Sequence, residues 1–434
     1  MLRNLTAYFN NLNYLWLLKK HQWKKWRDLE DIQFKKLKAI ISYAYEYVPY
    51  YHQLFRSAGF KPIDLKDKNC IKKIPITTKM NLRRAYPSTI AKGLDPSRHL
   101  SNFTSGSTGI PLRVIKDIKT AVYHHAQDIY TLIECGVSFR DIFVYIRARE
   151  SMKTPKPYSI LPGNLRTYTI PVFQESEKIL DILRQIKPNA IETYPSVLMD
   201  LSICDTSGIN PEKIFAIGET LSQYCRDVVR RAFNVEINEL YGSIEFENMS
   251  FECNEHAGLH IITDSVLLEF LDQNYENVSA GETGEIVVTD LLNHAMPFIR
   301  YKLGDFVVPS DERCSCGRGW PLIKKIEGRT NDYLVLPSGR KMSFYTLYMF
   351  INKDLEEQLF TILQWQIIQE KRNKLVLKVI KGKEFSRGAV ERLRKKIETI
   401  FITIGEEVEV DIQVVDNIPR GKTGKRQAIV SFVR

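Results

Sequence analysis

The stretch AIETYPSVLMDLSICDTSGINPEKIFAIGET, residues 190–220, decides the fold class of this chain. It begins with a short apolar run at 190–194 that is typical of a buried strand. Residues 196–203 have helical spacing, and a second buried strand is predicted at 213–217, ending at the turn that contains Gly218 and Glu219. Strands that alternate with helices at this spacing indicate a mostly parallel sheet.

The alternation continues on both sides of this stretch. Further helices are predicted at 117–135, 175–186 and 222–233, and further strands at 142–146 and 235–240. We therefore predict an α/β fold with a doubly wound, mostly parallel sheet. Ligands of such sheets bind beyond the carboxyl ends of the strands, so the strand-end turns are candidate parts of a binding site.

The remaining regions differ from this pattern. Residues 31–58 have a continuous helical pattern, residues 150–172 are rich in Pro and Gly and predict a loop, and residues 260–310 are β-rich. After about residue 330 the order becomes strand, strand, charged helix, strand and a Gly/Lys loop. We predict a large N-terminal domain at 1–329, with a β-rich subdomain, and a small mobile α+β domain at 330–434.

Composition narrows the class of protein. The chain has 434 residues, of which 44% are hydrophobic, enough for a large core. Its seven cysteines are odd in number and widely spread, which argues against a disulfide framework and for a reducing, cytoplasmic compartment. No apolar run is long enough to span a bilayer.

Positive charge is concentrated near the N-terminus. The first 100 residues hold 20 Lys and Arg against 7 Asp and Glu, whereas the rest of the chain holds 42 against 44. Residues 11–27 place three tryptophans among the basic residues, as in an amphipathic helix. We expect this helix to pack onto the protein body, with weak contact to a membrane surface as the alternative. No nucleic-acid partner is expected.

The sequence NFTSGSTGIP, residues 102–111, contains six consecutive Ser, Thr and Gly residues at 104–109. Such a segment can present backbone N–H groups and hydroxyls to a phosphate. A flexible linker is the alternative, but the run is short and bounded by apolar, strand-like sequence. It is not a Walker loop, because no Gly-Lys-Ser/Thr follows.

Four later motifs carry groups that suit a nucleotide. YGSIE, residues 241–245, places a carboxylate at a strand end, where it could hold Mg²⁺. YKLGD, residues 301–305, offers a carboxylate to sugar hydroxyls, although Gly-Asp is also a common turn. GRTND, residues 328–332, lies where the predicted pattern of strands and helices changes from the large domain to the small one. IPRGKTGK, residues 418–425, is either a solvated basic tail or a loop that delivers Lys425 to a phosphate.

In this order, the motifs TSGSTGIP, IGET, YGSIE, YKLGD, GRTND and IPRGKTGK resemble those of the adenylate-forming superfamily of acyl-CoA synthetases. The resemblance is closest to the phenylacetate–CoA ligase branch and its capsule-biosynthesis-associated relatives, and it extends from about residue 30 to the end. It implies ATP-dependent adenylation of a carboxylic acid, an aryl acid at the family level, followed by thioester formation with coenzyme A. An amide ligase, an AMP transferase and a non-catalytic anion-binding protein are the alternatives.

The resemblance also implies a role for each matching position. The phosphate loop would consist of Thr104, Ser105, Gly106, Ser107, Thr108 and Gly109. The adenine and its surroundings would be contacted by Gly218, Glu219, Tyr241, Gly242 and Ser243, and the ribose by Asp305 and Arg329. Glu245 would bind Mg²⁺, Asn331 would be the hinge, and Lys425 would be the catalytic lysine. Two departures from the family pattern are Leu112-Arg113 after Pro111 and Asn in place of Asp at the hinge.

A metal site is predicted from Cys253 and His256 together with Cys314 and Cys316, with His260 as a competing ligand. A Cys-x2-His pair and a Cys-x-Cys pair can complete a tetrahedral zinc site, and unpaired thiols are the alternative. The resemblance implies that the zinc is structural.

The sequence leaves the acid pocket and the oligomeric state open. Candidates for the acid pocket are His124, His125, Tyr145 and Tyr194. The oligomeric state is open, with a homodimer as one option.

Overall fold

The computed structural model describes residues 2–104, 111–148, 166–329, 333–343, 347, 362–382 and 385–433. The chain divides into two compact units. The first unit contains residues 1–136, 155–162 and 240–325, and the second contains residues 137–154, 163–239 and 326–434.

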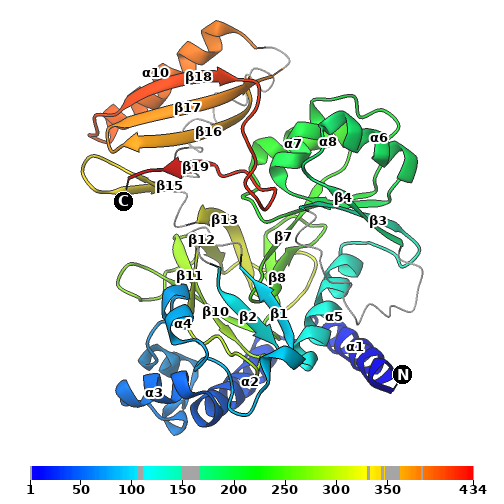
Figure 1. The fold of residues 1–434 in the computed structure, drawn as a ribbon, viewed down its shortest axis with the longest axis vertical. Coiled ribbons are helices and arrows are strands. Elements are labelled where there is room, and N and C mark those ends of the chain that lie inside the picture. Colours follow the sequence, from blue (N-terminus) through cyan, green and yellow to red (C-terminus); the bar gives the residue numbers. More distant parts are fainter. Residues whose placement is uncertain are drawn as a thin grey trace. The chain divides into compact units, whose positions relative to one another are not determined.

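Four parallel strands form the centre of the second unit. They are β3 (Ile142–Arg147), β4 (Arg166–Pro171), β5 (Ala190–Thr193) and β6 (Lys213–Ile217), in the order β6-β5-β3-β4. The helices α6 (Ser176–Ile186), α7 (Pro195–Ser202) and α8 (Gln223–Phe233) lie together against them (Figure 1). Their apolar faces share one buried cluster with the strands, which confirms the predicted alternation.

Strand β4 lies within residues 150–172, a segment that was predicted to be rich in loop and for which no strand was predicted. Its first four residues are exposed and only Ile170 is fully buried, so the segment lacks the apolar run that marks a central strand. It pairs with β3 along its whole length. An edge strand is stabilised by these main-chain hydrogen bonds, which leave little trace in side-chain hydrophobicity.

The second unit also contains a four-stranded sheet of order β18-β17-β16-β19. Its members are β16 (Ile362–Lys371), β17 (Lys374–Lys381), β18 (Glu409–Val415) and β19 (Ile429–Ser431). Helix α10 (Arg387–Thr403) packs on this sheet through Leu393, Ile397 and Phe401 (Figure 1). The short strands β14 (Tyr333–Val335) and β15 (Lys341–Ser343) pair beside it, so the predicted α+β unit is confirmed.

The first unit is rich in strands, as predicted for 260–310, and the structure shows that they pair antiparallel. Its strand order is β10-β11-β12-β13-β9-β8-β7. The strands are β7 (Ile237–Ser243), β8 (Glu247–Glu252), β9 (Leu259–Ile261), β10 (Val266–Leu271), β11 (Gly284–Asp290), β12 (Tyr301–Ser310) and β13 (Leu322–Arg329). A separate hairpin joins β1 (Leu100–Phe103) to β2 (Arg113–Lys116).

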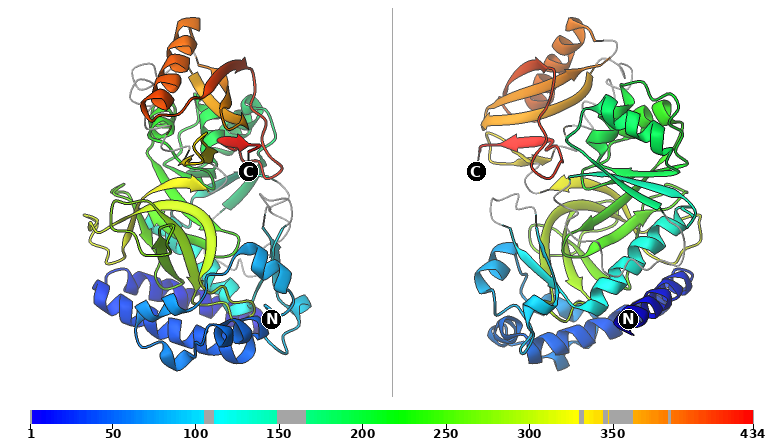
Figure 2. Two further views of the ribbon diagram at one scale, coloured as in Figure 1. Left: turned by 90° about the vertical axis from the view of Figure 1, so that its left-hand side faces the viewer. Right: turned by 45° about the vertical axis from the view of Figure 1, so that its right-hand side comes forward.

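Helices border the first unit: α1 (Leu2–His21), α2 (Trp26–Tyr47), α3 (Pro49–Ser57), α4 (Lys79–Ala85) and α5 (Ile118–Glu134). Helices α1 and α5 run side by side (Figure 2). The helical pattern predicted over 31–58 is divided between α2 and α3 at Val48, whose backbone is extended because Pro49 follows it. Among the described residues, no helix is both long and apolar enough to cross a membrane.

Candidate functional site

The hairpin of β1 and β2 holds both ends of the predicted phosphate loop. The backbone N–H of Thr104 donates to the Leu112 carbonyl at 3.0 Å, and the Leu112 N–H donates to Thr104 Oγ1 at 2.9 Å. Thr104 is therefore a buried anchor at the neck of the loop. The other five predicted residues, Ser105, Gly106, Ser107, Thr108 and Gly109, lie outside the described residues, and their contact with phosphate stays a prediction.

Position 242, the second-last residue of β7, requires glycine. A Cβ atom added to Gly242 would lie 2.1 Å from the carbonyl oxygen of Glu247, which is a fixed backbone atom. The pairing of β7 with β8 shifts register between Tyr241 and Gly242. The close approach of the two strands therefore produces the tight turn that carries Ser243 and Glu245.

Two tyrosines connect the YGSIE and YKLGD motifs. The Tyr241 hydroxyl donates to Asp305 Oδ2 at 2.8 Å, and the Tyr301 hydroxyl donates to Glu245 Oε1 at 3.2 Å. All four residues are buried. The two motifs are thus cross-linked by hydrogen bonds, and each buried carboxylate has a hydroxyl donor that stabilises it.

Lys116, at the end of β2, is a buried cation that the sequence reasoning missed. It is 3% exposed, and its Nζ lies 2.8 Å from Oε1 of Glu247, two residues after Glu245. A lysine at the end of a short strand usually reaches solvent, so nothing in the local pattern distinguishes this one. Its position adds a fixed positive charge beside the β7–β8 turn.

In the second unit, Lys425 lies against the turn that follows β6. Gly218 has a φ of +82°, and a Cβ atom there would lie 2.6 Å from Lys425 Nζ. The ammonium group also lies 5.5 Å from the centroid of the Tyr194 ring. Two predicted motifs from distant parts of the chain, IGET and IPRGKTGK, are therefore neighbours, and Tyr194 contacts this lysine.

Glu219 connects the same turn to the lysine loop, which comprises residues 416–428 between β18 and β19. Its carboxylate accepts hydrogen bonds from the Ser196 N–H at 2.8 Å, the Ser196 hydroxyl at 3.0 Å and the Arg426 N–H at 2.6 Å. Burial raises the pKa of Glu219, and these hydrogen bonds act in the opposite direction. Glu219 thus positions the lysine loop.

A second set of contacts, here named the Asp200 cluster, consists of Asp200 and Ser196 of α7, Arg420 and Arg426 of the lysine loop, and Gln364 of β16. Arg420 forms an ion pair with Asp200 and donates to Ser196 Oγ at 2.7 Å. Arg426 Nη1 lies 2.7 Å from Asp200 Oδ1, and Gln364 Nε2 donates to the same oxygen at 2.8 Å. One carboxylate therefore binds both arginines that flank the lysine in sequence.

The sequence could have indicated the arginines of the Asp200 cluster but not the aspartate. Arg420 and Arg426 bracket the GKTG loop, and paired arginines imply a carboxylate partner. Nothing in the sequence marked Asp200, because a single aspartate in a predicted helix is common.

The remaining predicted residues are placed as follows. Arg329 is exposed at the end of β13, and Asn331 lies outside the described residues. His125 is buried on α5, where its ring is 2.9 Å from the side-chain nitrogen of Asn11, so it joins α5 to α1. The meeting of Lys425 with Glu245 and Asp305 in one site stays a prediction.

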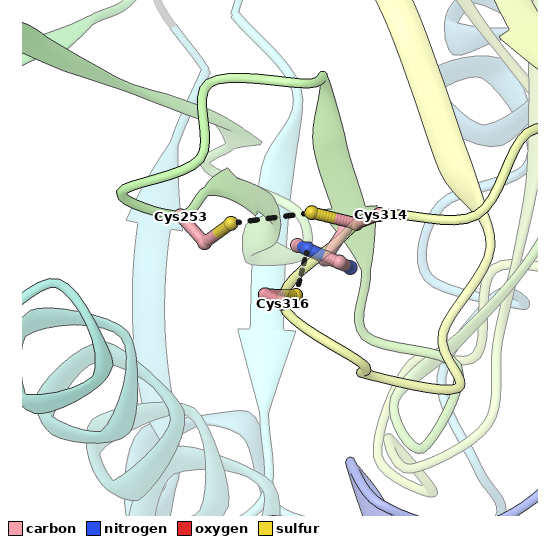
Figure 3. Close-up of side chains that lie close together, drawn as sticks. Cys253, Cys314 and Cys316 are labelled. Carbon is pink, nitrogen blue, oxygen red and sulfur yellow. Dashed lines mark hydrogen bonds between the residues drawn. The ribbon is translucent and has the colours of Figure 1, made fainter.

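Three cysteines and one histidine of the first unit form a compact cluster (Figure 3). It consists of Cys253, His260, Cys314 and Cys316, whose ligand atoms all lie within 4.8 Å of one another. The sulfurs of Cys253 and Cys314 are 3.6 Å apart, and Cys316 Sγ is 3.4 Å from His260 Nε2. A tetrahedral zinc with Zn–S bonds of about 2.3 Å places its sulfur ligands about 3.8 Å apart, so the spacing fits.

The histidine of this cluster is His260 rather than the predicted His256. His256 has a left-handed backbone with a φ of 51°, and its Nδ1 lies 3.3 Å from Oε1 of Glu252. His260 is carried by β9, and burial lowers its pKa to about 4, which leaves a neutral ring with a lone pair available. Sequence spacing could not decide between the two, because the choice depends on which side of the turn faces the thiols.

Comparisons of the sequence with known proteins find similarity to phenylacetate–coenzyme A ligases and to CapK. Residues 348–431 match the family model described as the CapK C-terminal domain. The chain is 28% identical over 330 residues to a phenylacetate–coenzyme A ligase of Thermus thermophilus, covering 71% of this chain and 72% of that protein. It is 25% identical over 263 residues to protein CapK of Staphylococcus aureus, covering 58% and 55% of the two chains.

Solved structures confirm the fold class. A 2-hydroxyisobutyryl-CoA ligase, crystallised with its acyl-AMP, has a TM-score of 0.78 at 18% identity, over 95% of this chain and 91% of that one. An anthranilate CoA ligase has a TM-score of 0.57 at 15% identity, over 79% and 68% of the chains. At these identities the likeness establishes the fold alone.

Proposed function

We propose that this chain, a relative of the phenylacetate–coenzyme A ligases and of CapK, is an AMP-forming ligase that activates a carboxylic acid with ATP and transfers it to coenzyme A. Its motifs occur in the order of that family, and its fold is that of acyl-CoA ligases. The observation that carries the proposal is the contact of Lys425 with the Gly218 turn, because it brings a cation to the carboxyl end of a parallel strand.

The proposed reaction has two steps. A carboxylate oxygen of the acid attacks the α-phosphorus of ATP, the bond to the bridging oxygen breaks, and pyrophosphate leaves with the electron pair. The deprotonated thiol of coenzyme A then attacks the acyl carbon, and AMP leaves. The first step joins two anions, so the protein contributes mainly positioning and positive charge.

Each of these residues would have a separate role in the adenylation step. The ammonium of Lys425 would neutralise charge that develops around the α-phosphorus, and the loop at 104–109 would hold the departing pyrophosphate. Glu245 would hold Mg²⁺, because a carboxylate is a preferred ligand of that ion, and the metal would supply charge to the phosphates. Tyr301 keeps the Glu245 carboxylate oriented through its 3.2 Å hydrogen bond.

ATP–pyrophosphate exchange with a panel of aryl and aliphatic carboxylic acids tests the first step. Labelled pyrophosphate should enter ATP only when the panel contains an acid that the enzyme adenylates. Absence of exchange with every acid, by a folded protein that binds ATP, would favour a non-catalytic anion-binding role.

The acceptor is tested separately from the acid. Once an acid supports exchange, adding coenzyme A should yield the acyl thioester and AMP. Amide formation with an added amine, or adenylation of another compound without thioester, would instead favour an acceptor other than coenzyme A.

The proposed domain boundary lies between residues 329 and 330, with Asn331 as the hinge. The match to the CapK C-terminal domain at 348–431 falls inside the smaller domain and supports this division. Rotation of that domain between the two steps would remove Lys425 after adenylation and admit coenzyme A.

The cluster of Cys253, His260, Cys314 and Cys316 is proposed to hold a structural zinc. Its spacing and its four protein ligands suit a closed tetrahedral site with no position for substrate. Burial raises the pKa of Cys253 to about 12, so a cation is needed to keep its sulfur as a thiolate. A zinc here would connect the β8–β9 turn to the segment before β13.

We expect His260→Ala to lower zinc content and thermal stability, and His256→Ala to leave the zinc content unchanged. Loss of a zinc that bridges two segments should lower the melting temperature by at least about 4 °C, since a loss of about 2 kcal/mol or more is expected and each kcal/mol shifts the melting temperature by roughly 2–4 °C. Metal analysis and thermal unfolding of the purified variants measure both effects. Cys70→Ser, which changes a thiol outside the cluster, is the control.

The opposite result would contradict this ligand set. If zinc were lost from His256→Ala and retained by His260→Ala, the assignment of His260 as the histidine ligand would be wrong. Wild-type protein without zinc after purification in zinc-supplemented buffer would remove the metal proposal altogether.

A further inference from the structure

The outward face of α1 carries large apolar side chains that the proposed chemistry does not use. Trp16 is 57% exposed, Leu12 is 37% exposed and Phe9 is 65% exposed. These residues recur at spacings of three and four, so they lie along one side of the helix. Trp23, just beyond the helix, is also 56% exposed.

The opposite side of α1 is attached firmly to the first unit. Asn11 pairs with His125 of α5, the Tyr14 and Tyr123 rings lie 4.9 Å apart, and the Tyr130 hydroxyl donates to Gln22 at 2.6 Å. These contacts attach α1 along α5 and hold its exposed face in one orientation, so the helix does not need to fold on binding.

Basic side chains predominate in the segment that carries this face, although Glu134 of α5 lies 3.8 Å from Lys19 Nζ. The first 27 residues contain six basic side chains, Arg3, Lys19, Lys20, Lys24, Lys25 and Arg27, and no Asp or Glu. Lys19 and Lys20 are exposed in the last turn of α1, where Lys20 Nζ lies 5.0 Å from the centroid of the Trp16 ring. Apolar rings with a basic border are the pattern of a helix that lies in the interface of an anionic bilayer.

We propose that α1 docks this protein onto an anionic membrane surface, with Leu12 and Trp16 inserted among the lipids and Lys20 and Lys25 contacting the headgroups. A second copy of the chain is a less suitable partner for this face of α1, because a symmetric contact would place two basic segments without acidic residues against each other. Nucleic acid is also poorer, because the centre of the face is apolar rather than charged. The inference is independent of which acid the enzyme activates.

Co-sedimentation of the full chain with lipid vesicles tests the proposal. The protein should bind vesicles that contain phosphatidylglycerol and bind pure phosphatidylcholine much more weakly, with binding falling as salt is raised. The double variant Lys20→Glu/Lys25→Glu should lower the partition coefficient by at least about 25-fold, since each charge near the surface contributes about fivefold. Leu12→Ser/Trp16→Ser should also release the protein, and it should do so at low salt as well.

Tyr275→Ser removes an aromatic ring of similar exposure elsewhere in the first unit and should bind like wild type. Circular dichroism and thermal unfolding verify that each variant is folded. Equal binding to both lipid mixtures, or no binding to either, would overturn the proposal. So would a dimer in light scattering that Leu12→Ser/Trp16→Ser dissociates, or tight binding of an oligonucleotide that competes with vesicles.

Discussion

Replacing Lys425 with Ala is expected to lower ATP–pyrophosphate exchange by roughly 10²–10³-fold while ATP still binds. One preorganised group that stabilises charge in a transition state has an effect of this size. The Lys425 ammonium lies between the Gly218 turn and the Tyr194 ring, so its removal takes a positive charge directly from the carboxyl end of β6. Exchange kinetics with a saturating acid, together with ATP affinity from calorimetry, measure the two effects separately.

Lys422→Ala is the matched control for this variant. Lys422 belongs to the same loop but is exposed, so its removal should leave exchange close to wild type. The Lys425→Ala enzyme should also convert added acyl-AMP and coenzyme A to thioester at a near-normal rate, because the proposed mechanism uses the lysine in the first step only. Near-normal exchange by Lys425→Ala would refute the assigned role.

Replacing Asp200 with Ala is expected to lower adenylation by about a hundredfold or more, although Asp200 has no proposed role in binding ATP or the acid. Asp200 pairs with Arg420 and Arg426, and its removal leaves two largely buried cations without their carboxylate. Breaking such a pair costs about 3 kcal/mol or more, and 1.36 kcal/mol corresponds to a factor of ten in a population. The lysine loop would then leave its docked position, and Lys425 would lose its place beside Gly218.

Two measurements distinguish this docking role from a general loss of stability. Hydrogen exchange should rise in residues 416–428 and remain unchanged in β3 and β5. Thioester formation from acyl-AMP should persist, because the proposed second step takes place after the loop has left this position. Asp205→Asn, which changes an exposed aspartate bound to Arg184, is the control and should behave like wild type. Uniform deprotection of the second unit with loss of both half-reactions would contradict the docking role.

Much of this architecture follows from local patterns. The strand-and-helix alternation at 175–240 is predictable because buried parallel strands need continuous apolar runs and their connecting helices need one apolar face. The motifs at 218–219, 241–245, 301–305 and 418–425 are recognisable because turns that approach a ligand need glycine or a specific polar group. Gly242 illustrates this requirement, since any Cβ there would meet the Glu247 carbonyl at 2.1 Å.

Other parts of the site depend on contacts that no local pattern records. The sequence offered two histidines for the cysteine cluster, and only the packing of β9 against the turn before β13 selects His260. Lys116 has the appearance of a surface lysine until the fold buries it against Glu247. Residue types and spacing thus determine the fold class, the motifs and the chemistry they suit. Tertiary structure alone decides which side chains meet, because Asp200, Gln364 and Arg426 come together only when distant strands and helices pack.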